Sequence, residues 1–96
     1  MVARAGLYDR PRRILVRVRV LAFARLREVL GFGQRDIELA AGATVETLWD
    51  HVLAPFASAA GLRASTRFAR NGALVDGTTP LRDGDEVALM PPVGGG

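Results

Sequence analysis

ILVRVRVL, residues 14–21, carries the clearest β-strand pattern in this 96-residue sequence. Apolar side chains at the even positions alternate with arginines at 17 and 19, a period of two that is typical of a strand with one buried face. We therefore expect the even positions, from Ile14 to Val20, to face the core. The same parity places Phe23 on the opposite face, toward solvent or a partner.

A short helix and a second strand are predicted next. Residues 24–30 contain helix-forming side chains and end at Gly31, a common helix stop. Residues 35–39 alternate again and predict a strand antiparallel to the first, followed by a turn at 41–43.

The main helix is predicted from an apolar stripe that follows Thr44, a good N-cap residue. Pro55 lies inside the stripe and lacks a backbone N–H, so we expect the helix to kink or end there. We expect Trp49 to be a core residue and not a platform for a ligand, because its place in the apolar stripe accounts for it. The stripe comprises Val45, Leu48, Trp49, Val52, Leu53 and Phe56, at spacings of three and four.

The last third of the sequence predicts short strands joined by tight turns. Residues 67–70 and 73–75 flank Asn71-Gly72, a strong hairpin signal, and 83–85 form a second turn before a strand at 86–90. One amphipathic helix must then cover one face of a small mixed sheet. The predicted fold is an α+β, β-grasp (ubiquitin-like) roll with one main helix packed on one face.

Composition limits the chemistry that this chain can perform alone. It has no Cys and a single His, His51, which lies off the helix stripe and is expected at the surface. Thiolate metal sites and catalytic thiols are therefore absent, and we expect no metal site and no autonomous active site. No apolar run is long enough to span a bilayer, and residues 1–20 lack a secretory pattern, so we expect a cytoplasmic protein.

The charge distribution divides the chain into three parts. Residues 1–20 hold six of the thirteen Arg and one Asp, whereas the remainder is slightly acidic. We predict a flexible basic extension at 1–13, a folded domain at 14–92 and a flexible Gly-rich tail at 93–96. We do not expect the extension to bind nucleic acid, because aromatic residues are not interleaved with its arginines.

The chain ends in Val93-Gly94-Gly95-Gly96 after a proline pair. Glycines can thread a channel that is too narrow for other residues, and they bring the terminal carboxylate to a reacting atom without a nearby β-carbon. Such a carboxylate can be activated elsewhere by attack on the α-phosphate of ATP, which gives an acyl adenylate. The alternative is an ordinary frayed terminus.

Three segments resemble the small subunit of molybdopterin synthase: VLAFARLRE at 20–28, Asn71-Gly72, and LRDGDEVALMPPV at 81–93. The resemblance runs from about Val16 to Gly96. It implies that an adenylating enzyme of the ubiquitin-activating type uses ATP on Gly96, and that a sulfur donor then makes the thiocarboxylate. No cofactor is implied on the chain itself, which is a non-catalytic subunit.

The resemblance also implies a partner, the large synthase subunit, which receives the tail and forms the molybdopterin dithiolene with its sulfur. Phe23, Leu74 and Met90 are expected to contact this subunit, while Gly94 and Gly95 thread into it. The Gly94-Gly95-Gly96 ending also resembles the thiamine-pathway sulfur carrier, so a carrier for thiazole or another sulfur acceptor is the alternative. A plain interaction or nucleic-acid module is the third hypothesis.

Overall fold

The computed structural model describes residues 14–91, with the backbone only for residues 57–60. The flexible extension predicted at 1–13, and the tail predicted at 93–96, lie outside the described residues. Within them, no helix is long and apolar enough to cross a membrane. The elements are β1 (Leu15–Ala22), α2 (Ala24–Leu30), β2 (Gln34–Ala40), α3 (Val45–Leu53), the 3-10 helix η1 (Ala57–Ser65), β3 (Arg67–Arg70), β4 (Ala73–Val75) and β5 (Glu86–Met90).

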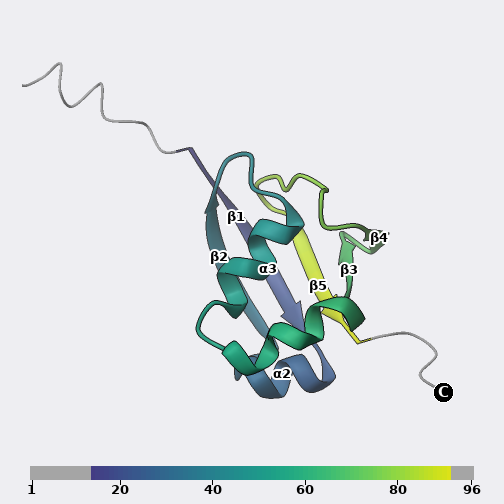
Figure 1. The fold of residues 1–96 in the computed structure, drawn as a ribbon. Coiled ribbons are helices and arrows are strands. Elements are labelled where there is room, and N and C mark those ends of the chain that lie inside the picture. The colour runs from purple at the N-terminus through teal and green to yellow at the C-terminus, as the bar shows by residue number, and fades with distance from the viewer. Residues whose placement is uncertain (1–13, 92–96) are drawn as a thin grey trace, which may run out of the picture.

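The strands form one mixed sheet in the order β2-β1-β5-β3-β4. The central pair, β1 and β5, is parallel, and the other neighbours are antiparallel. Figure 1 shows α3 and η1 crossing one face of this sheet, with α2 at the end where β1 and β5 finish. Because the central strands are parallel, the first described residue and the last lie at opposite ends of the sheet.

The core lies between the sheet and α3. Val16, Val18 and Val20 are buried under the helix, and every member of the predicted stripe from Val45 to Leu53 is buried too. Trp49 packs edge-on against Phe68 of β3, with ring centroids 6.0 Å apart. The predicted β-grasp roll, with one main helix on one face of a mixed sheet, is confirmed.

Ile14 corrects the predicted core. Its side chain is 69% exposed and the strand begins one residue later, at Leu15. The backbone carbonyl of Ile14 still accepts a hydrogen bond from the N–H of Ala41, at 2.9 Å. Parity therefore predicted the buried face correctly from Val16 to Val20, but Ile14 lies before the strand and outside the core.

Helix α3 begins and ends where the sequence predicts. The Thr44 hydroxyl accepts the N–H of Thr47, and the Thr47 hydroxyl accepts the N–H of Thr44, both at 3.2 Å, which satisfies two free donors of the first turn. The helix ends at Leu53, before Pro55. Phe56 follows the helix end but still packs partly buried against the core.

The hairpin turn is tied to the start of β5. Asn71 and Gly72 have φ values of 51° and 88°, the left-handed pair that a tight hairpin turn requires. The Asn71 amide donates to Asp85 Oδ1 and accepts the N–H of Glu86, both at 2.9 Å. These bonds join the turn between β3 and β4 to the start of β5.

The 3-10 helix η1 is an element that the sequence patterns did not predict. The Arg63 guanidinium binds the Glu46 carboxylate at 2.6–3.0 Å, and it also lies over the Phe68 ring, 4.6 Å from the centroid. This hydrogen-bonded pair lowers the pKa of Glu46 below its ordinary value. A β-carbon at position 77 would lie 2.5 Å from Glu46 Oε1, so Gly77 leaves the space in which the pair forms.

Candidate functional site

The face of the sheet opposite α3 is open, and all three predicted partner residues carry apolar side chains on or beside it. Phe23 is 44% exposed, Leu74 is 64% exposed and Met90 is partly exposed. The first two are among the few large apolar side chains that residues 14–91 leave exposed. Large exposed apolar side chains on a small domain mark an interaction surface when they gather in one place.

The strand register brings these residues together. Ala69 is opposite Leu74 on one side and opposite Ala88 on the other, so all three share the open face. Ala22 is opposite Leu89 in the parallel β1–β5 pair, and Phe23 and Met90 are the residues that follow them. We call the set Phe23, Leu74, Met90, Leu21 and Ala88 the apolar patch.

Leu21 and Ala88 were not predicted as part of the patch. They are opposite each other in the β1–β5 register, and both are partly exposed. The same alternation that placed Phe23 and Met90 outward applies to them, because each lies two residues earlier in its strand. The signal for both was therefore present in the sequence.

The other half of the open face is charged. Arg17 and Arg19 of β1 pair across the sheet with Glu38 and Asp36 of β2, at 2.8 Å and 3.4 Å. The hydrogen bond that Arg17 donates to the Glu38 carboxylate raises the pKa of Arg17 above its ordinary value. The charged pairs thus lie over β2 and the first part of β1. The apolar patch runs from Leu21, near the end of β1, across β5 and β3 to Leu74 of β4, with the exposed Arg67 beside it.

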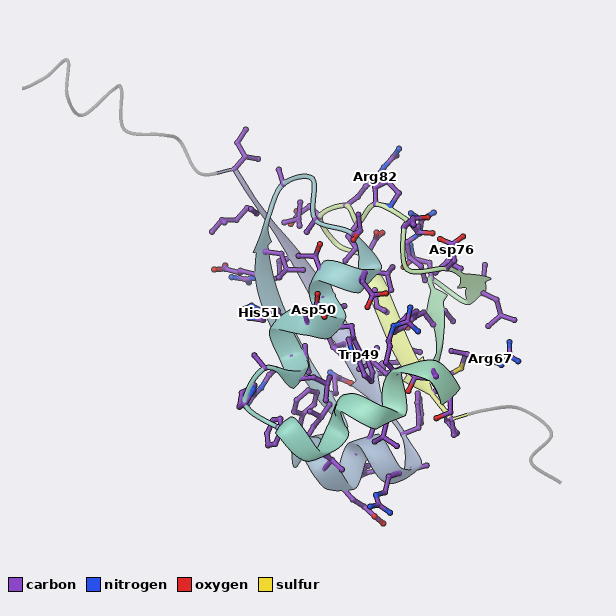
Figure 2. All side chains as sticks on the ribbon, in the orientation of Figure 1. Trp49, Asp50, His51, Arg67, Asp76 and Arg82 are labelled. Carbon is purple, nitrogen blue, oxygen red and sulfur yellow. The ribbon has the colours of Figure 1, made fainter. Side chains whose placement is uncertain are left out.

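The apolar patch lies where the C-terminal tail begins. Strand β5 ends at Met90, and Pro91 is the last described residue. Figure 2 labels Arg67, which is opposite Met90 in the β3–β5 register and marks this end of the sheet. The predicted working residues Gly94, Gly95 and Gly96 lie outside the described residues.

The polar residues of α3 lie elsewhere. Asp50 and His51 are both exposed, and Figure 2 shows them on the helix that covers the opposite face of the sheet from the patch. In the part of the chain from 14 to 91, no three His, Asp or Glu side chains gather where they could hold a metal ion. The candidate site in residues 14–91 is therefore the apolar patch, a surface suited to contact with another protein.

Comparisons with known proteins agree with this description. A profile of the ThiS family matches residues 20–96. The molybdopterin synthase sulfur carrier subunit of Chlamydomonas reinhardtii is 36% identical over 83 residues, which span 84% of this chain and 100% of that protein.

Solved structures show the same fold. A putative molybdopterin converting factor subunit 1 from Pyrococcus furiosus is 32% identical, with a TM-score of 0.73 over 81% of this chain and 99% of that one. A complex of subunits 1 and 2 of the molybdopterin-converting factor from Helicobacter pylori contains a chain that is 28% identical, with a TM-score of 0.57 over 84% and 100%. With a family match that spans most of its length and a β-grasp fold shared with these structures, this chain belongs to the ThiS family.

Proposed function

We propose that this chain is the sulfur carrier of a molybdopterin synthase and that the sulfur is held on the carboxyl group of Gly96. The observation that carries the proposal is the β1–β5 register, which sets Ala22 opposite Leu89, so that Phe23 and Met90 follow at the end of the sheet where the described chain ends. A partner that covers this patch is positioned to receive the tail. The family match and the name of the Chlamydomonas relative support the same function.

The chemistry needs an enzyme other than this chain. The Gly96 carboxylate attacks the α-phosphate of ATP, and pyrophosphate leaves, which gives an acyl adenylate. Hydrosulfide released by a sulfur donor then attacks the acyl carbon and AMP leaves, so that the C–S bond replaces the acyl–phosphate bond and the terminal carboxylate becomes a thiocarboxylate. Because the chain has no Cys, it cannot hold the sulfur as a persulfide of its own.

Two protein partners follow from this chemistry. An adenylating enzyme of the ubiquitin-activating type binds the tail with ATP, and the large synthase subunit later takes the sulfur. The Helicobacter pylori complex joins subunits 1 and 2 of the molybdopterin-converting factor, and by analogy we assign the apolar patch to the large-subunit contact. The use of ATP agrees with the cytoplasmic location expected from the sequence.

The second candidate function is a sulfur carrier for thiazole synthesis. It is favoured by the Gly94-Gly95-Gly96 ending and by the family to which the chain belongs. The first steps at Gly96 would be the same, and only the acceptor protein would differ. Loaded carrier offered to a molybdopterin synthase large subunit and to a thiazole synthase, in parallel reactions, distinguishes the two functions by which one removes the sulfur.

The test of the proposed function changes the end of the chain and leaves the fold alone. We expect that deleting Gly96, or adding one Ala after it, abolishes sulfur transfer in a reconstituted assay, while circular dichroism and thermal unfolding stay unchanged. The matched control adds one Ala before Met1, at the opposite terminus, and should keep full activity. Full activity in the chain with Ala after Gly96 would contradict the proposal.

A further inference from the structure

A small pocket opens at the end of the sheet, next to the apolar patch. Its walls come from three parts of the chain that are distant in sequence: Phe23 and Leu26 at the start of α2, Leu62 and Thr66 at the end of η1, and Pro91 after β5. The cavity measures about 50 Å³. Figure 1 shows α2, η1 and the end of β5 meeting at this end of the molecule.

The size of the pocket indicates what it can hold. Pockets that bind small molecules and cofactors usually measure about 300–1,000 Å³, and a cavity of about 150 Å³ holds one benzene ring. This pocket is therefore too small for a cofactor or an aromatic ring and can admit only a small aliphatic side chain. Leu26 is buried and forms part of the core, whereas Phe23 is 44% exposed and belongs to the apolar patch. The pocket therefore connects the core to the patch, and a protein that covers Phe23 also covers the pocket.

The backbone next to Phe23, which forms one wall of the pocket, has a strained conformation. Ala24 has a φ of 50°, in the left-handed region, which costs a residue other than glycine about 1–2 kcal/mol. Its two neighbours, Phe23 and Arg25, both line the pocket. The Phe23 carbonyl accepts the N–H groups of Leu26 and Arg27, at 3.1 Å and 3.3 Å, which keeps this turn closed. Such backbone strain clusters at ligand-binding positions.

The wall formed by η1 is also fixed in the free protein. The Arg63–Glu46 pair ties η1 to α3, and the Thr66 hydroxyl donates to the Leu62 carbonyl at 2.7 Å. A pocket whose walls are already ordered can bind a partner side chain without the entropic cost of ordering them.

We propose that this pocket receives one small aliphatic side chain of the large synthase subunit, which anchors the interface where β5 ends. The inference rests on the proposed function, which sends the residues after Pro91 into the large subunit and so leaves the pocket free for the partner. The pocket is continuous with the apolar patch assigned to the same contact. Side chains that fill such preformed pockets near the centre of an interface supply much of the binding energy.

Filling the pocket tests the proposal. Ser65 lines the pocket and is exposed, so Ser65→Leu places a larger side chain there without disturbing the core. The matched control is Ala64→Leu, the exposed preceding residue of η1, which does not line the pocket. In titration calorimetry of the full chain with the large subunit, we expect Ser65→Leu to raise Kd by at least about tenfold. Ala64→Leu should stay within about twofold of the wild type, and both variants should unfold at the wild-type temperature.

Each result has one reading. Equal affinity of Ser65→Leu and the wild type would overturn the pocket proposal, whereas a wild-type chain that does not bind the subunit would overturn the proposed function instead. Methyl NMR separates the possible occupants. If the methyl signals of Leu62 shift when the large subunit is added, the partner occupies the pocket. If these signals shift only when residues 92–96 are removed from the free chain, the chain's own tail occupies the pocket and the proposal is wrong.

Discussion

The two faces of the sheet are made by the same five strands, yet they differ in what covers them. Under α3, the inward side chains of β1 and β5, such as Val18, Val20 and Leu89, are fully buried. On the other face Leu74 remains exposed, and so does Phe23, which follows the end of β1. We therefore predict that the covered face holds this small fold, and that the apolar side chains on the open face add little to folding and serve the partner contact proposed above.

Breaking the covered face should have the largest effect. Leu48 of α3 is completely buried between the helix and the sheet. We expect Leu48→Ala to lower the free energy of unfolding by about 2–5 kcal/mol, because it leaves a cavity that the neighbours fill only in part. Leu74→Ala on the open face is the matched control and should cost less than about 0.5 kcal/mol. Urea denaturation measures both, and equal losses would contradict the division between the faces.

Breaking the open face should affect binding more than folding. We expect Phe23→Asp to weaken binding of the large subunit by more than about 2 kcal/mol, because it sets a charge in an apolar contact. Its free energy of unfolding should change by no more than about 0.5 kcal/mol. Ile14→Asp is the control, since Ile14 is also exposed but lies at the opposite end of the sheet. If calorimetry finds that both variants bind the large subunit equally well, the apolar patch is not part of the interface.

The smallest effect is expected at the ion pair that holds η1 beside the covered face. Arg63 lowers the pKa of Glu46 below its ordinary value, so the pair stabilises the fold at pH values above the unfolded pKa, about 4.5. This contribution is lost as the pH falls through the folded pKa. Both side chains are more than a third exposed, so solvent screening limits the pair to about 0.2–1 kcal/mol.

Glu46→Gln should therefore lower stability by that amount at pH 7 and by nothing once the Glu46 carboxylate of the wild type is protonated. Glu28→Gln is the control, because Glu28 is exposed and forms no ion pair with another residue in the range 14–91. Thermal unfolding at several pH values measures the difference. A difference between Glu46→Gln and the wild type that persists unchanged in acid would show that the charge is not what holds η1.

The sequence patterns predicted the parts of the fold that depend on periodicity. Alternation set the faces of β1 and β5, and the apolar stripe with Thr44 and Pro55 set the bounds of α3. Segment 57–65 has neither period, and η1 is held by the contact of Arg63 with Glu46, which is distant in sequence. Patterns also cannot show how far a core extends, which is why Ile14 was wrongly predicted to be buried.

The same distinction applies to the site. Phe23, Leu74 and Met90 were predicted from parity and from the family resemblance, and the structure finds the first two exposed and Met90 partly exposed. The pocket beside them was not predicted, because one of its walls is η1. Its other walls meet only through the parallel pairing of β1 with β5, a long-range contact that no local pattern specifies.

The intact mass of the full chain after incubation with ATP, the adenylating enzyme and a sulfur donor shows whether Gly96 holds the sulfur. We expect a gain equal to the mass difference between sulfur and oxygen, located by fragmentation in Gly95-Gly96 and absent when ATP is withheld. A resting carboxylate is a poor electrophile, and it needs the adenylate as a leaving group before sulfur can attack. Sulfur found upstream of Val93, or gained without ATP, would show that the carboxyl group of Gly96 is not the sulfur carrier.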